Sequence, residues 1–426
     1  MLADDIGGLE AARESLARER LEELQALART YRNWSVKELA HALGRQPGRL
    51  VPDSGMPKID LVVGLAKALD WPVEAVVDHL IKPADETHRS RAQDAPADYA
   101  RLYNESLIKR LERDYAEAVR LAVRAHAAAD TPTRSAAALI LEAQAHEACG
   151  SYTESVRCLR HAGRIDGVAV DWRMFGDSNL ANMLFMQGQS THALGIASSV
   201  LEYLGSLPET EAARSARVTA SWARGHALRT SIPLSNFEQW RPLAESARQD
   251  FKTVREVTDA LLSISGERRS HYGTMHASVE PVLLEVDALC EPESAEQIVR
   301  TLVSMVRENG TLEPGPGERK AWAAIALANT VKRFLDDELQ RRGILEIASS
   351  TLRAHAVATS NWYFAHQHLE IEAERRRMFS GHGVAARALD ALEAKLVAGV
   401  LGHIPAARRN ADEFMAMYAN RDGGRA

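Results

Sequence analysis

Histidines and cysteines, the residues best suited to metal chemistry, stand at spacings in this chain that do not favour a metal site. His271 and His276 are five positions apart, and His366 and His368 are two apart. Two ligands on one helix face are normally separated by four positions. The three cysteines form no Cys-x-x-Cys pair and are odd in number; they are Cys149, Cys158 and Cys290. We therefore predict no metal site and no disulfide framework.

Two further motifs resemble catalytic or phosphate-binding patterns only in part. Ser106 and Lys109 match Ser-x-x-Lys, but no companion motif for a nucleophilic serine accompanies them. The Gly- and Pro-rich stretch 313–317 precedes a predicted helix, yet it follows no strand and lacks the lysine and hydroxyl of a phosphate-binding loop. We interpret 310–317 as a plain loop. The chain is accordingly expected not to be an enzyme and to need no cofactor.

Composition indicates a protein of the cytoplasm. The chain of 426 residues is 46% hydrophobic and 26% charged, with a net charge of -6. These values are typical of globular proteins and give no global attraction to nucleic acid, so any DNA contact must come from a local basic patch. No apolar run is long enough to span a membrane, and the N-terminus is acidic where a signal peptide would be basic. The excess of arginine over lysine, with abundant alanine, favours a bacterial source.

Helical periodicity dominates the chain, and no convincing strand pattern interrupts it. We predict an all-α fold with four segments: a helical domain over 1–82, a polar linker over 83–98, a helical repeat domain over 99–420 and a disordered tail over 421–426. Beyond residue 204 the predicted helices cover 212–228, 243–265, 279–289, 296–309, 318–335, 344–357, 362–378, 384–397 and 407–417.

The repeat domain begins with three copies of one pattern, each a turn followed by small residues at helical spacing. The copies are aligned by Tyr115, Tyr152 and Ser190, which are 37 and 38 positions apart. In each copy small or apolar residues follow three, seven and ten positions later, where the second helix of a hairpin would pack on the first. These positions are 118, 122 and 125, then 155, 159 and 162, then 193, 197 and 200.

This pattern resembles the tetratricopeptide repeat (TPR), a helical hairpin of roughly 34 residues, although Ser190 replaces the aromatic in the third copy. The resemblance implies a solenoid whose first helices line a groove that holds a peptide or protein. Asn329 lies in a Leu-Ala-Asn triplet like that at 180–182, and Trp362 is a candidate apolar anchor. The predicted ligand-binding residues are Tyr103, Arg110, Gln144, Glu147, Asn182, Phe185, Asn329 and Trp362. The alternative is that these are ordinary exposed polar and packed aromatic residues.

The N-terminal segment carries its own set of helix signals. A long helix is predicted over 9–31. Ser35 and Glu38 form a capping box at the start of a second helix, with Trp34 placed to pack on Leu39. Gly44 ends that helix. Two more helices are expected after Pro57.

The order of these helices resembles the Cro/repressor-like helix-turn-helix family over residues 20–80, and this implies DNA binding through the element after Gly44. Two features depart from the family: Val36 replaces the usual glutamine, and Pro47, Gly48 and Pro52 limit the recognition element to about one turn. The predicted DNA-binding residues are Lys37, Arg45, Gln46, Arg49 and Lys58. The alternative is a docking or dimerisation module whose arginines are merely solvated.

With both resemblances together, the chain is similar to bacterial peptide-sensing regulators. In these proteins a TPR-like solenoid binds an effector and controls the helix-turn-helix heads of a homodimer. The expected partners are therefore DNA and a peptide, protein or small effector, with no membrane. The competing interpretation is a TPR scaffold or adaptor whose degenerate helix-turn-helix serves docking or dimerisation.

Overall fold

The computed structural model describes most of the chain as helices. The described residues are 34–52, 57–69, 99–233, 237–264, 269–308, 316–379 and 391–408, with scattered positions between 18 and 29 and between 73 and 80. Within these ranges there is no strand, which confirms the all-α prediction. The chain divides into two compact units, Met1–Ala95 and Pro96–Ala426. The predicted linker over 83–98 and tail over 421–426 lie outside the described residues. None of the described helices is both long and apolar enough to cross a membrane.

The N-terminal unit contains α2 (Val36–Ala42), the single 3-10 turn η1 (Pro47–Arg49) and α3 (Ile59–Leu69). The predicted capping box is present, since the Glu38 N–H donates to Ser35 Oγ and the Ser35 N–H donates to the Glu38 carboxylate. Gly44 follows α2 with a φ of 63°, the left-handed conformation that glycine adopts without steric cost. As the prolines predict, the element after Gly44 is only one turn long.

A small apolar core holds this unit together. Buried leucines meet there, among them Leu24, Leu39 of α2 and Leu65 of α3. The Gln25 side chain donates a 2.8 Å hydrogen bond to the backbone oxygen of Leu50, which links the end of η1 to Gln25.

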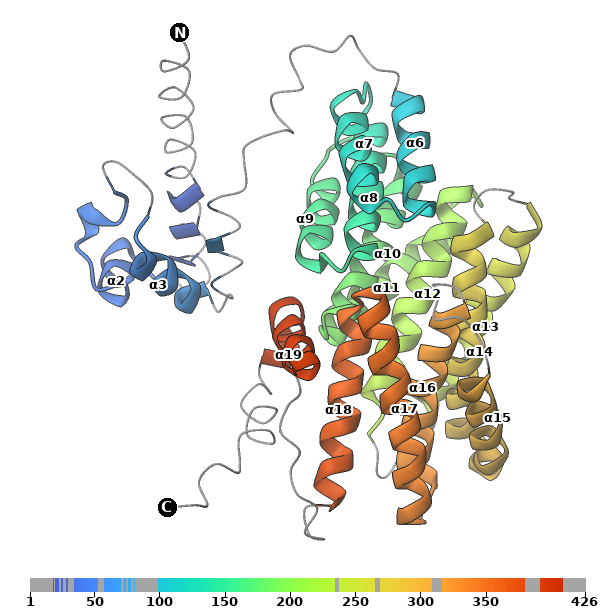
Figure 1. Cartoon of the computed structure of the whole chain (residues 1–426). Coiled ribbons are helices and arrows are strands. Elements are labelled where there is room, and N and C mark those ends of the chain that lie inside the picture. Colours follow the sequence, from blue (N-terminus) through green and yellow to red (C-terminus); the bar gives the residue numbers. More distant parts are fainter. Residues whose placement is uncertain are drawn as a thin grey trace, which may run out of the picture. The chain divides into compact units, whose positions relative to one another are not determined.

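The C-terminal unit is a succession of antiparallel helices, each packed on its neighbours along the chain (Figure 1). The helices are α6 (Tyr99–Leu111), α7 (Tyr115–Ala127), α8 (Pro132–Ala148), α9 (Tyr152–Gly163), α10 (Val170–Met186), α11 (Ser190–Leu204), α12 (Glu211–Ser231), α13 (Arg241–Ile264), α14 (Arg269–Cys290), α15 (Ala295–Arg307), α16 (Pro316–Phe334), α17 (Glu338–Thr359), α18 (Trp362–Phe379), α19 (Ala391–His403) and the short α20 (Pro405–Arg408). Short 3-10 turns precede α13 and α15.

The first three hairpins share the predicted register. The second helices α7, α9 and α11 begin at Tyr115, Tyr152 and Ser190, the three residues that align the repeats. Two positions before each of these starts, the backbone is left-handed, at Arg113, Gly150 and Gly188. In all three turns the next backbone N–H reaches back five residues to a carbonyl of the preceding helix, which is the closing hydrogen bond of a Schellman motif.

The small residues of each repeat are buried as the pattern predicts. Ala118, Ala122 and Ala125 are fully buried, and the matching positions of the other two copies are at most 4% exposed. Small side chains at these points let the two helices of a hairpin approach closely and share a core with the next hairpin.

The last helices of the unit pack back on the early hairpins. The Tyr152 hydroxyl at the start of α9 donates a 3.0 Å hydrogen bond to Oδ1 of Asn361, at the turn between α17 and α18. At Gly150 an added Cβ would lie only 2.7 Å from the backbone oxygen of Ser360. At Gly188 it would lie 2.6 Å from Cβ of Ala406. The solenoid is therefore closed by contacts between repeats that are far apart in the sequence.

Some predicted boundaries were wrong. Helix α14 begins at Arg269, ten residues before the predicted start, and runs through Pro281. The predicted loop 310–317 is too long at its end, because Pro316 and Gly317 form the first residues of α16. Proline is well tolerated there, since the first N–H groups of a helix have no partner within the helix. The start of the predicted helix 384–397 and most of 407–417 lie outside the described residues.

Candidate functional site

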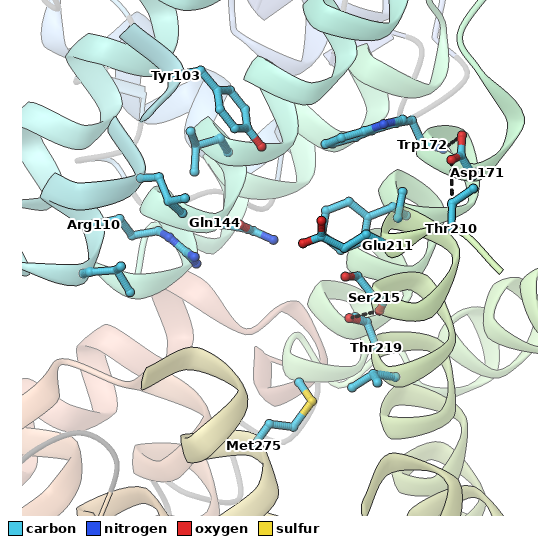
Figure 2. Close-up of a pocket in the computed structure, with 16 residues that line it drawn as sticks. Tyr103, Arg110, Gln144, Asp171, Trp172, Thr210, Glu211, Ser215, Thr219 and Met275 are labelled. Atoms are coloured by element: carbon cyan, nitrogen blue, oxygen red, sulfur yellow. Dashed lines mark hydrogen bonds between the residues drawn. The ribbon is translucent and has the colours of Figure 1, made fainter. Parts of the chain in front are cut away.

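A pocket with a volume of about 290 Å³ lies among five helices of the C-terminal unit. Helices α6 and α8 line one side, and α10 with the start of α12 lines the other; Met275 of α14 also borders the pocket (Figure 2). The lining residues are Tyr103, Leu107, Arg110, Leu111, Leu141, Gln144, Asp171, Trp172, Phe175, Thr210, Glu211, Ala212, Ser215, Val218, Thr219 and Met275. Three of the predicted groove residues, Tyr103, Arg110 and Gln144, are therefore brought together here.

Aromatic and aliphatic side chains make up much of the wall. Tyr103 stacks on Tyr99 with ring centroids 5.6 Å apart. Trp172 meets Phe175 edge to face at 5.9 Å. Rings that are already packed against one another lose little freedom when a ligand covers them, so this wall is suited to an apolar group.

Charge is distributed unevenly across the pocket. The guanidinium of Arg110 lies beside Gln144 on one side, and Glu211, Ser215 and Thr219 lie on the other (Figure 2). Asp171 adds a second carboxylate near the start of α12, where its Oδ2 accepts a 2.8 Å hydrogen bond from the Thr210 hydroxyl. A ligand with a positive and a negative end would find complementary groups on the two sides.

Amide side chains link the first helices of neighbouring hairpins. Gln144 Nε2 donates a 3.1 Å hydrogen bond to Oδ1 of Asn179. One turn further along the same helices, Asn182 Nδ2 donates a 3.1 Å hydrogen bond to Oε1 of Glu147. Asn179 was missed by the sequence analysis, although it lies 35 positions after Gln144, close to the repeat length. The predicted amides thus bond across the hairpins in this structure.

Two carboxylates beside this row carry raised pKa values. Burial raises the pKa of Glu147 to about 7, against the opposing effect of the nearby Arg110 guanidinium. Burial also raises the pKa of Glu318 on α16 to about 7, and the charge of Glu147 contributes in the same direction. Burial is the main cause for both groups, because it disfavours the charged form of a carboxylate.

The other five predicted ligand contacts do not line the pocket. Glu147 and Asn182 bond to each other beside it. Phe185 is 2% exposed and packs in the core against His226 and Tyr363. Asn329 donates a hydrogen bond to Glu285. Trp362 stacks on His403, with ring centroids 5.0 Å apart. The prediction assumed an open groove. In this unit α12 and α18 cover Phe185, Asn329 contacts α14, and Trp362 contacts α19.

The predicted DNA-binding residues lie around the η1 turn of the N-terminal unit. Lys37, Gln46, Arg49 and Lys58 are exposed. Arg45 differs, because its Nη2 forms a 2.7 Å ion pair with Oδ2 of Asp60. This pair ties the residue after Gly44 to the first turn of α3.

The weak catalytic patterns of the sequence acquire structural roles. Ser106 is fully buried, and its hydroxyl donates a 2.7 Å hydrogen bond to the Ala118 backbone oxygen across the first hairpin. His368 Nδ1 lies 2.9 Å from the Ser349 hydroxyl in the interior. The 310–315 part of the Gly- and Pro-rich loop lies outside the described residues.

Comparison with known proteins finds one weak structural match to report and no sequence match. No protein-family model and no curated protein sequence matches the chain. A solved structure, Bacillus thuringiensis PlcR in complex with the peptide PapR7 and DNA, matches 68% of this chain and 100% of its own. The sequence identity is 12% and the TM-score 0.33. At that level of likeness the partners of PlcR are not transferred to this chain.

Proposed function

We propose that the chain is a ligand-responsive regulator, in which the C-terminal unit binds a small amphipathic ligand and the N-terminal unit binds DNA. The observation that carries the proposal is the pocket between α6 and α12. It combines an aromatic wall with a guanidinium on one side and carboxylates on the other. Polar groups that converge beside aromatic and aliphatic side chains on a concave surface are usual features of a ligand site.

The ligand class follows from size and charge. A volume of about 290 Å³ is at the lower end of ligand pockets, which are roughly 300–1,000 Å³, so a long extended peptide does not fit inside. A whole peptide of two or three residues suits it better. A carboxylate would pair with Arg110, an ammonium with Glu211 or Asp171, and an apolar side chain would pack on Trp172.

DNA is proposed as the partner of the N-terminal unit because four exposed polar or basic residues lie in or near η1: Lys37, Gln46, Arg49 and Lys58. Lysine and arginine contact phosphates, and this contact gives affinity and position but little sequence information. With η1 reduced to one turn, we expect phosphate contacts to dominate. In a homodimer, ligand binding would control DNA affinity by changing the spacing of the two units.

The second candidate is an adaptor whose N-terminal unit docks a protein. Two observations favour it. Arg45 is engaged by Asp60, and the apolar side chains of Val36 and Ile59 are 39% and 68% exposed. Exposed aliphatic residues beside a short recognition element suit a protein contact as well as a DNA contact.

A DNA titration over a salt series separates the two candidates. Fluorescence anisotropy with a random-sequence duplex is expected to give a binding constant that falls steeply with salt, because binding releases counterions from the phosphates. Replacing Arg49 and Lys58 by alanine should reduce the slope of log K against log salt by about 2, one for each contact. Arg160→Ala, an exposed arginine of the C-terminal unit, is the matched control. Absence of binding at about 10 μM protein in low salt would favour the adaptor.

A further inference from the structure

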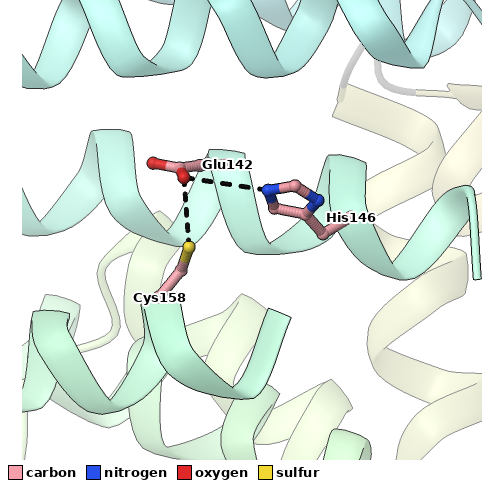
Figure 3. Close-up of side chains that lie close together, drawn as sticks. All are labelled: Glu142, His146 and Cys158. Carbon is pink, nitrogen blue, oxygen red and sulfur yellow. Dashed lines mark hydrogen bonds and ion pairs between the residues drawn. The ribbon is translucent and has the colours of Figure 1, made fainter. Parts of the chain in front are cut away.

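Glu142, His146 and Cys158 form a cluster of metal-ligating side chains in the hairpin of α8 and α9 (Figure 3). Glu142 and His146 are separated by four positions on α8, so both project from the same face of that helix. Cys158 comes from the facing side of α9. The three side chains thus supply a carboxylate oxygen, an imidazole nitrogen and a sulfur to one point.

The distances between these atoms are close to those of a metal site. Cys158 Sγ lies 3.2 Å from Oε1 of Glu142, and His146 Nε2 lies 3.8 Å from the same oxygen. All three ligand atoms lie within 4.8 Å of one another. Around a tetrahedral zinc ion with bonds of about 2.0–2.3 Å, neighbouring ligand atoms are roughly 3.4–3.6 Å apart. Small side-chain rotations would therefore bring the three atoms into coordination.

The cluster is buried on the side of Cys158 and Glu142 and partly open to solvent at His146. Cys158 is fully buried and Glu142 is 6% exposed, whereas His146 is only partly covered. Cys149, at the end of α8, donates a 3.3 Å hydrogen bond from Sγ to the backbone oxygen of His146. A buried carboxylate beside a buried thiol is also costly unless a positive charge compensates it.

Arg157 is the cation that faces the cluster from α9. Its Nη2 lies 3.8 Å from Oε1 of Glu142 and 3.7 Å from Sγ of Cys158. Its side chain is 59% exposed and forms a second, shorter ion pair with Glu154 at 2.8 Å. The guanidinium can turn toward Glu154 and solvent, so it competes with a bound cation without blocking the cluster.

We propose that Glu142, His146 and Cys158 bind one Zn²⁺-class ion, with water in the fourth position. Nitrogen, sulfur and carboxylate oxygen together are a donor set that zinc and cobalt accept readily, whereas calcium and magnesium take oxygen alone. Binding displaces the thiol proton and any proton on His146 Nε2 to solvent, and leaves a thiolate, a carboxylate and a neutral imidazole on the metal. The site joins the two helices of one repeat and does not depend on the proposed regulatory function.

Cobalt titration of the untagged, chelator-treated full chain tests the proposal. The expected result is one Co²⁺ per chain, with a near-ultraviolet thiolate-to-cobalt band and the visible absorption of tetrahedral cobalt, both displaced by Zn²⁺. Cys158→Ser should lose the thiolate band, and Glu142→Gln should weaken binding at least ten-fold. Cys290→Ser, the matched control on α14, should keep the thiolate band and the cobalt affinity of the unsubstituted chain. Circular dichroism of each variant establishes that it is folded.

Arg157→Gln supplies a second measurement of cobalt affinity, in which all three proposed metal ligands are left intact. Removing the competing cation should raise cobalt affinity several-fold over the unsubstituted chain. The proposal is overturned if the unsubstituted chain shows no thiolate band at millimolar Co²⁺. It is equally overturned if the band survives in folded Cys158→Ser, because the sulfur ligand would then lie elsewhere.

Discussion

The hydroxyl of Tyr152 and the side chain of Asn361 are joined by a 3.0 Å hydrogen bond across 209 positions of sequence. The same Asn361 oxygen accepts the backbone N–H of Phe364 at 3.2 Å and so caps the start of α18. One amide thereby connects the aromatic residue of the second repeat to the C-terminal helices. Tyr152 begins α9, the helix between the pocket helices α8 and α10.

Tyr152→Phe should lower the free energy of unfolding by about 1 kcal/mol, because the ring still fills its buried position and only one hydrogen bond is lost. Urea denaturation followed by circular dichroism measures the change. Tyr203→Phe is the control, since Tyr203 is 56% exposed. Equal stability of the two variants would show that the contact with Asn361 contributes nothing.

Glu285→Gln should be far more damaging, with a loss of about 3–5 kcal/mol. Glu285 is 1% exposed and accepts hydrogen bonds from Arg229, Asn329 and Arg333. Its replacement leaves two buried guanidinium groups without a counter-charge. Glu291→Gln removes an exposed ion pair with Arg248 and should cost less than about 1 kcal/mol. A similar loss in both variants would contradict the prediction.

Stability should depend on pH through buried histidines. Burial lowers the pKa of His355 to about 4, below its ordinary value of 6.5. As pH falls below 6.5, His355 binds a proton in the unfolded chain but stays neutral in the folded chain until the pH approaches 4. The contribution of His355 is therefore complete above pH 6.5 and is lost toward pH 4, at up to about 1.4 kcal/mol per pH unit. His368, whose pKa burial also lowers to about 4, acts in the same direction.

The measurement is the free energy of unfolding at several pH values for the unsubstituted chain and His355→Leu. The variant should lose stability less steeply between pH 6.5 and 4, because one of the titrating groups has been removed. Parallel curves would mean that His355 has the same pKa in both states.

Two helical glycines should respond oppositely to alanine. A Cβ at Gly225 of α12 would lie 2.9–3.2 Å from three ring atoms of Phe251, and overpacking of this kind costs about 1–3 kcal/mol. A Cβ at Gly195 of α11 would meet nothing within 4 Å, so alanine there should stabilise by about 0.5–1 kcal/mol. Thermal unfolding of both variants checks the signs, and a gain at Gly225 would contradict the packing.

Local features of the fold could be predicted because the residues that determine them are close in sequence. The glycine turns before Tyr152 and Ser190 follow from the left-handed conformation at Gly150 and Gly188. The capping box follows from Ser35 and Glu38 alone. Both patterns need only a few neighbouring residues, and both are present.

The closure of the solenoid could not be predicted, because no periodicity relates Tyr152 to Asn361. Phe185 illustrates the consequence: in an open repeat its position would face a groove, but here it is covered by His226 and Tyr363. The cluster of Glu142, His146 and Cys158 was detectable in part. A search of histidine pairs misses it, since the partner of His146 four positions away is a carboxylate.

Native mass spectrometry with synthetic tripeptides tests the central claim, a ligand pocket between α6 and α12, most directly. The unsubstituted chain should retain one tripeptide per pocket from a mixture that covers all side-chain classes. Arg110→Ala should bind the retained tripeptide about 10- to 100-fold more weakly, since a charge-assisted hydrogen bond contributes about 1.5–3 kcal/mol. Arg101→Ala, an exposed arginine on the same helix that pairs with Glu105, should bind it unchanged. Absence of any adduct at millimolar tripeptide, or equal binding by the two variants, would contradict the account.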